Sequence, residues 1–515
     1  MNMNGIGKTR QSNEGAGSVC IAAAVFALLY LACFAGGIIT EYPLSILAFV
    51  IFSIHVLYLF LHKIFFFKYI WLIVMLAWLV VADALLVMNP IWLNELQLST
   101  FENGSLLPIA ACVSATLQFI LFLEVISNKS SLREDNGESI TFSKEHITLV
   151  KIAGIAALVV AICAFLSVAP HPSWAVARDR FDYAVNYLPS FLRNFQSLLI
   201  LLVPLAAPCM KIGANKIFYG VVGFYTLYLL WTGEKFTSLF LLLYILLLAC
   251  LIPRMRKLDI SNLRRIVRRL LVLLGTVIVC FLVLVFIQYV RQFDGVSAAI
   301  GTFEQRIAAQ AEVWWGVYED SQVHGAFRAD EVEDELEIIS ITGISDDLRV
   351  NGGIWKLMRV VMPYDYFQMY VDNSTRLTSS TQATLYYYFG FPGMLIGMLV
   401  LALFYYFVIN SAVSAFERGS IFEGILAVYL IRIMHGVITM SDFSDLFYWR
   451  SLLVIAFLIL LAMMRAMSMR KRYSARACSF ERAPSEHMLV SAPESKGDSS
   501  KDFACMRKGF LGDSH

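Results

Sequence analysis

The chain has few charged residues for its length. Asp, Glu, Lys and Arg make up 16% of its 515 residues, and 58% of the residues are hydrophobic. A soluble globular domain has roughly 25% charged residues, so this composition favours a chain that is largely exposed to lipid. The formal net charge is only +2, so no basic excess points to nucleic acid as a partner.

The cysteine patterns that stabilise small domains or bind metal ions are also missing. The nine cysteines lie in apolar stretches or near the two ends of the chain, with no CxxC and no Cys/His cluster. Neither a disulfide framework nor a zinc site is therefore expected. An acidic run from Asp330 to Glu337 lacks the spacing and the glycine of a calcium loop, and we interpret it as a solvated helix face. We expect no metal and no cofactor.

Apolar stretches near 20 residues long dominate the sequence instead. A helix needs about 20 residues to cross a hydrocarbon core of ~30 Å, so the chain is predicted to be an all-α polytopic integral membrane protein with about 12 transmembrane helices. The predicted spans are Val19–Ile39, Tyr42–Leu61, Tyr69–Met88, Leu106–Ile126, Ile152–Val168, Phe191–Met210, Ile217–Thr232, Lys235–Ile252, Leu270–Tyr289, Leu385–Ile409, Ile421–Met440 and Phe447–Met464.

Basic residues are absent from the short loops Thr40–Glu41 and Asn89–Ser105, which lie on one predicted side of the membrane. The other side carries both termini and 28 of the 41 Lys and Arg residues. Positive charge collects on the cytoplasmic side of membrane proteins, so both termini are predicted to be cytoplasmic.

These spans and loops divide the chain into four parts. Residues 1–289 form a membrane domain of nine spans, residues 290–384 a large outer loop, residues 385–464 three further spans, and residues 465–515 a cytoplasmic tail that we expect to be disordered. The outer loop is predicted to form a lid of short helices. One of them is Thr302–Tyr318, because its apolar residues recur at three- and four-residue spacing.

Outer cations are not needed for topology, so those that occur are candidates for binding an anionic lipid headgroup. Arginine presents a planar fork of donors that suits phosphate oxygens. The alternative is that each pairs with a nearby acid, as Asp179 and Asp182 would allow. The candidates are Arg178, Arg180, Lys235, Arg291, Arg306 and Arg376.

Ionisable residues inside predicted spans are functional candidates because placing them in lipid is costly. Arg432 and His435 lie one turn apart in the eleventh span, and His435 is a candidate general base. The alternative is that Arg432 pairs inside the bundle with Asp83 or another acid.

The tenth span begins after a run of Ser and Thr that ends at Thr381, and it contains Pro392, Gly393 and Gly397. A hydroxyl-rich helix start can cap the helix or attract phosphate. Pro392 predicts a kink, and the two glycines predict close helix packing.

Three segments resemble a known family, the O-antigen polymerases (Wzy type), also called oligosaccharide repeat-unit polymerases. TSSTQATLYYYFGFPGMLIGMLVLALFYYF is similar to the segment that follows the large outer loop in that family, RIAAQAEVWWGVY to a basic and aromatic segment within the loop, and RDRFDY to the Arg/Tyr pattern of an earlier outer loop. Many spans with one large late outer loop are typical of the same family.

The resemblance implies a glycosyltransferase of the bacterial inner membrane that needs no metal. Its donor and acceptor would both be undecaprenyl-diphosphate-linked oligosaccharides, joined at the periplasmic face, with a chain-length regulator and a flippase as possible partners. The diphosphate would be bound by Arg178, Arg180, Arg291, Arg306 and Arg376. Lys235, Gln310 and Arg432 would be further substrate-binding residues, and Trp314 and Tyr318 would stack on sugars or, alternatively, be buried in the lid. The candidate bases are Glu304, Glu312, His324 and His435.

Two rival functions remain. An O-antigen ligase has a similar architecture and the same donor, but the large loop contains only one histidine, His324. A flippase or transporter of lipid-linked repeats would be expected to show repeated halves and short loops. The sequence has no internal repeat and a loop of about 95 residues.

Overall fold

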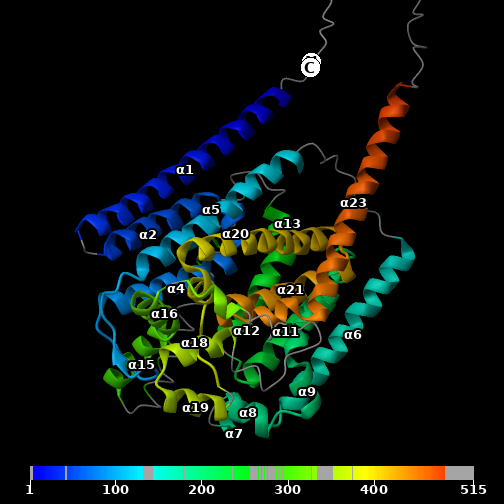
Figure 1. The fold of residues 1–515 in the computed structure, drawn as a ribbon. Helices are drawn as coiled ribbons and strands as arrows, with labels where there is room; N and C mark the ends of the chain where they lie inside the picture. The colour runs from blue at the N-terminus through cyan, green and yellow to red at the C-terminus, as the bar shows by residue number, and fades with distance from the viewer. Residues whose placement is uncertain are drawn as a thin grey trace, which may run out of the picture. The chain divides into compact units, whose positions relative to one another are not determined.

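The computed structural model is mostly helical (Figure 1). It divides into two compact units, Met1–Ile459 and Leu460–His515. The structure describes isolated positions between 256 and 294 and residues 4–40, 43–131, 143–177, 180–234, 236–255, 295–325, 327–332, 352–373 and 375–481.

Six helical segments in the described residues are long and apolar enough to cross a membrane. Large apolar side chains on them stay exposed, such as Ile38 and Ile39 at 80%, which is expected of a surface that faces lipid. Three shorter apolar helical segments accompany them, Ser45–Leu61, Gln196–Met210 and Ser238–Leu251. The six long segments are Gly17–Thr40, Ile70–Met88, Leu106–Ser127, Lys144–Val176, Thr381–Arg418 and Ile421–Met440. The all-α membrane fold is therefore confirmed, and the ninth predicted span falls where only isolated positions are described.

The first part of the chain builds most of the bundle. Its helices are α1 (Asn4–Thr40), α2 (Ser45–Leu61), α3 (Lys63–Lys68), α4 (Ile70–Met88), α5 (Leu106–Ser131), α6 (Lys144–Val168), α7 (Ser173–Val176), α8 (Arg180–Asn186), α9 (Ser190–Phe195), η1 (Gln196–Leu201), α10 (Leu202–Ala206), η2 (Ala207–Met210), α11 (Asn215–Trp231), α12 (Phe236–Leu246), the π-helix η3 (Leu247–Leu251) and α13 (Ile252–Met255). Between α4 and α5, strands β1 (Trp92–Leu93) and β2 (Leu98–Ser99) pair in an antiparallel hairpin.

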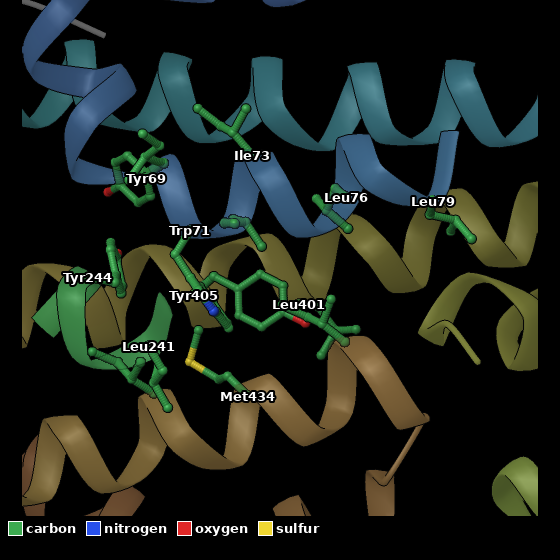
Figure 2. Packing of buried hydrophobic residues seen from close by; sticks show 14 of the residues in the cluster. Tyr69, Trp71, Ile73, Leu76, Leu79, Leu241, Tyr244, Leu401, Tyr405 and Met434 are labelled. Atoms are coloured by element: carbon green, nitrogen blue, oxygen red, sulfur yellow. The ribbon is translucent and has the colours of Figure 1, made fainter. Parts of the chain in front are cut away.

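Helix α5 lies at the centre of this packing. It contacts α1, α2, α4 and the later helix α20 (Thr381–Arg418), while α6 packs against α11. Trp71 of α4 and Tyr405 of α20 lie in the same buried cluster, which Figure 2 shows between the helices.

The predicted assignment of loops to two sides agrees with the contacts. At one end, Ser45 donates to Glu102 at 2.6 Å, and the Trp315 indole N–H donates to the Phe101 carbonyl at 3.2 Å. At the other end, the Lys68 ammonium lies 2.6 Å from both Glu124 and Asn410. Each end thus gathers segments that the span pattern assigns to one side of the membrane.

Helix α20 is broken at Gly390, which has φ 62° and ψ −167°. Pro392 follows two residues later, and a proline cannot donate to the carbonyl four residues before it. That carbonyl, of Tyr388, accepts a hydrogen bond from the backbone N–H of Arg328 at 3.1 Å instead. The predicted kink is confirmed, and it is also where residues 327–332 attach to the bundle.

The two predicted packing glycines face the other half of their own helix. A Cβ on Gly393 would lie 2.0 Å from Phe389, and one on Gly397 would lie 2.8 Å from Leu385. The predicted close packing is therefore present, but it joins the two arms of α20 across the kink rather than two separate helices.

Two threonines in the first turn of α20 bind the end of α21 (Ile421–Met440). Thr381 donates to the Val437 carbonyl at 2.6 Å, and Thr384 donates to the Ser441 hydroxyl at 2.9 Å. The last carbonyls of a helix have no partner within the helix. These contacts account for the hydroxyls of Thr381 and Thr384, and Ser380 caps α20 by accepting from the Ala383 N–H, without a phosphate ligand. The buried Ser379 hydroxyl has no partner within the described residues.

After α21 come α22 (Phe443–Phe447) and α23 (Trp449–Glu481). Helix α23 extends past the predicted span end at Met464 and into the second unit. The added segment contains four Arg, three Ala and two Met, which are good helix formers.

Candidate functional site on the lid

The lid consists of the described residues between 295 and 373. Its helices are α15 (Val296–Ala308), α16 (Glu312–His324), η4 (Ala329–Glu331), α18 (Gly353–Val361) and α19 (Tyr364–Asp372). Figure 1 labels α15, α16, α18 and α19. Helix α16 packs against α4, α18 and α20. The predicted lid of short helices is thus present at the Glu102 end of the bundle.

The predicted single helix Thr302–Tyr318 is wrong. Two helices, α15 and α16, are separated at residues 309–311, where Ala309 has ψ −14° and Ala311 has ψ −2°. No glycine or proline marks the break, and the apolar spacing continues through it. As a result, Glu312 begins a new helix instead of lying within a long one.

The aromatic residues of α16 mostly serve packing. Trp314 and Trp315 are each 1% exposed, and the Trp314 ring lies 5.2 Å from that of Tyr386 on α20. Tyr318 is half-buried, with its ring 5.5 Å from Tyr386. Trp314 is therefore buried in the lid, as the alternative to sugar stacking predicted. Tyr318 remains partly accessible.

Three cations at this end are bound to acids. Arg376 makes a forked contact with Asp442, at 2.7 and 3.5 Å. Arg328 lies 2.5 Å from Asp320 and against the ring of Tyr387. Lys356 lies 2.7 Å from Glu331. Burial alone would raise the pKa of Glu331, but its bonds to Lys356 and Tyr387 hold that pKa below its ordinary value.

Arg306 differs from these three cations. It is exposed near the end of α15, and its guanidinium has no ion pair or hydrogen bond within the described part of the chain. Gln310 donates to the Arg306 carbonyl at 3.4 Å, so the side chain of Gln310 lies back along the same turn. The charge of Arg306 is therefore unpaired among the described residues.

Glu312 is the most unusual acid of the lid. It is fully buried, and neither carboxylate oxygen has a hydrogen-bond partner in the described structure. Burial, reinforced by the nearby Glu95 carboxylate, raises the pKa of Glu312 well above its ordinary value. A buried carboxyl with a raised pKa is a candidate proton-transfer group.

Glu95, Arg306 and Glu312 meet around Tyr370 of α19. The Tyr370 hydroxyl lies 3.5 Å from Glu95, and burial together with the Glu95 and Glu312 carboxylates raises the pKa of Tyr370 to about 12. The sequence alone does not predict Glu95, because the pattern that distinguishes the loop after α4 is its lack of basic residues. The sequence signal that could have indicated Glu95 is that it is an acid in a short outer loop.

Replacing Glu312 with glutamine should stabilise the fold at high pH. Below the unfolded pKa the carboxyl is protonated in both states, so its raised pKa does not lower the free energy of unfolding. As pH rises from the unfolded pKa toward the raised folded pKa, the folded state loses stability. We expect Glu312→Gln to raise the melting temperature by a few degrees at pH 8 and to change it little at pH 4. Exposed Glu304→Gln on α15 is the matched control and should change neither value; equal melting of Glu312→Gln and wild type at pH 8 would contradict the burial argument.

The other predicted residues are dispersed. Glu304 is exposed on α15, and exposed His324 lies 2.8 Å from Asp320. His435 lies on α21 with its ring 5.8 Å from that of Trp71, away from the lid. Asp83 accepts a hydrogen bond from Ser105 at 2.9 Å and makes no ion pair with Arg432 within the described residues.

Four predicted ligands remain untested by the contacts. Arg178, Lys235 and Arg291 lie outside the described residues, and Arg180 is described only as the first residue of α8. Within the described residues, no group of three or more His, Cys, Asp or Glu could hold a metal ion.

A family model, described as a family of unknown function (DUF6418), matches residues 348–455. The match includes α18 to α22, with Arg376, Arg432 and His435, and leaves out Arg306 and Glu312. Comparison with curated proteins and with solved structures found no match.

Proposed function

We propose that this protein joins undecaprenyl-diphosphate-linked oligosaccharide repeat units into a surface polysaccharide at the periplasmic face of the bacterial inner membrane. The observation that carries the proposal is that Arg306 on the lid has no ion pair within the described residues, and that it and the buried acid Glu312 both lie close enough to Tyr370 to affect its pKa. Three neighbouring cations are bound to acids, so an exposed arginine without one is suited to an anionic substrate.

In the proposed arrangement the chain crosses the membrane about twelve times, with both termini in the cytoplasm and the lid outside. Six described segments are long and apolar enough to span. The basic residues between the spans support this direction because they favour the end that carries Lys68.

The reaction makes two demands on the protein. A hydroxyl of the acceptor repeat attacks the anomeric carbon of the donor sugar, a new C–O bond forms, and the bond to the lipid diphosphate breaks. The departing diphosphate takes the electron pair, and a base takes the hydroxyl proton. Arg306 would stabilise the charge that develops on the diphosphate. Glu312, once ionised, would be a stronger base than an exposed carboxylate because its pKa is raised.

The test is complementation of a strain that lacks this chain, with the length of the surface glycan as the readout. The proposal expects single-repeat glycan without the chain and long glycan when it is restored. Loss of single-repeat glycan as well would contradict it and favour a ligase or a flippase.

A further inference from the structure

An exposed phenylalanine lies where the lid joins the bundle. Phe327 is 73% exposed, and it belongs to residues 327–332, which attach the lid to α20. A single exposed apolar side chain is common on protein surfaces and by itself indicates nothing. What distinguishes Phe327 is the surface on which it lies.

The backbone holds Phe327 beside the kink in α20. Phe327 forms an antiparallel bridge with Phe389, and the next N–H, of Arg328, donates to the Tyr388 carbonyl at 3.1 Å. The Arg328 side chain is bound in turn to Asp320 of α16. Phe327 is therefore held in place by both the bundle and the lid, next to the point at which α20 bends.

The kink divides α20 into an arm covered by protein and an arm that faces lipid. Before the kink, Thr381, Gln382 and Ala383 are fully buried. After it, Ile396 is 63% exposed and Val400 is 60% exposed, on a segment that is apolar enough to cross a membrane. Exposed apolar side chains on such a segment are expected to contact lipid. The kink thus lies at the boundary between the lid and the lipid-facing surface.

The lipid-facing surface continues from the kink onto α1. Phe391 follows the kink, and its ring lies 5.3 Å from that of Phe34 on α1. One turn further along α1, Ile38 and Ile39 are each 80% exposed. Lipid-facing side chains therefore lie on two spans beside the kink that holds Phe327.

The charge next to Phe327 does not prevent contact with lipid. Taking a charge out of water is costly unless it is paired, and Arg328 lies 2.5 Å from Asp320. The first exposed charged residue after Phe327 is Asp330, three positions away. An exposed acid this close keeps the segment at the membrane surface, so Phe327 can reach only the upper part of the acyl chains.

We propose that Phe327 inserts into the lipid leaflet on the lid side and ties the base of the lid to the membrane surface. The partner is the bilayer itself, contacted just below its headgroups. The inference goes beyond the proposed function and does not depend on it, because the anchor needs only a membrane span with the lid beside it.

Photocrosslinking of the full-length protein in phosphatidylcholine nanodiscs tests the anchor. The photoreactive residue p-benzoylphenylalanine replaces Phe327. On irradiation its ketone takes a hydrogen atom from a nearby C–H group, the two carbon radicals join in a new C–C bond, and the ketone becomes an alcohol. We expect mass spectrometry to find a peptide that contains position 327 and carries the mass of one added phosphatidylcholine.

Tyr364 supplies the matched control. It is an aromatic residue of the lid and is 72% exposed, but it lies on α19, which is separated from α20 in Figure 1. The same photoreactive residue at position 364 should give severalfold less lipid adduct. Equal lipid adducts at the two positions would overturn the anchor, as would a position 327 that crosslinks only to the chain itself or not at all.

A second measurement covers the case in which the photoreactive chain does not accumulate. Phe327→Trp should add tryptophan fluorescence that dibrominated phosphatidylcholine quenches, because bromine quenches only at short range. Tyr364→Trp should add fluorescence that the same lipid quenches much less. Equal quenching of the two variants, or none in Phe327→Trp, would also overturn the anchor.

Discussion

Replacing Arg306 with alanine should abolish long surface polysaccharide and leave single-repeat glycan in place. The guanidinium has no partner in the described structure and is exposed, so its removal should not destabilise the fold. Losing a charged group that stabilises a departing diphosphate costs on the order of 10²–10³ in rate. The measurement is the glycan ladder on a gel, from a strain complemented with the variant at matched membrane levels.

Two variants sharpen this result. Arg306→Lys keeps the charge but loses the planar fork, and should restore only part of the ladder. Arg450→Ala removes an exposed arginine that packs on Trp449, and should keep the full ladder. A complete ladder from Arg306→Ala would remove Arg306 from the proposed site.

The second large effect concerns folding. Replacing Lys68 with methionine should remove most of the protein from the membrane. Lys68 is fully buried and lies 2.6 Å from Glu124, which also accepts from the Tyr69 hydroxyl at 3.2 Å. Removing one partner of a buried ion pair costs about 3–5 kcal/mol, because the other charge remains buried. That is a large part of a typical stability of about 5–15 kcal/mol.

The double variant Lys68→Met/Glu124→Met separates this explanation from a simple loss of packing. With both charges gone, no buried charge is left unpaired, so the protein level should largely recover. Lys63→Met, in the same short helix but only half-buried, should have little effect. Levels are measured by fluorescence-detected gel filtration of detergent extracts, and a double variant as poor as Lys68→Met would contradict the account.

The long helices could be predicted because a membrane span depends mainly on local composition. The span expected at Tyr69–Met88 is α4, Ile70–Met88, and the span expected at Ile421–Met440 is α21 with the same bounds. The division between α15 and α16 could not be predicted, because apolar spacing continues across Ala309 and Ala311.

The site was only partly predictable, because pairing depends on residues far apart in the chain. Arg306 and Arg376 look alike in the sequence, but Asp442, 66 positions away, binds only Arg376. The charge pattern assigns Lys68 to a cytoplasmic loop, but in the fold Lys68 is buried against Glu124, 56 positions away. Sequence reasoning found Glu312 and Arg306, and only the fold adds Glu95 and Tyr370 to them.

The central claim is that the lid with Arg306 faces the periplasm, and cysteine labelling tests it most directly. Val323 on α16 is 70% exposed, and Lys144 is exposed at the start of α6, on the predicted cytoplasmic side. In intact spheroplasts, a membrane-impermeant maleimide should label Val323→Cys above the parent protein, and Lys144→Cys only after lysis. Labelling of Lys144→Cys in intact spheroplasts, with Val323→Cys protected until lysis, would contradict the account.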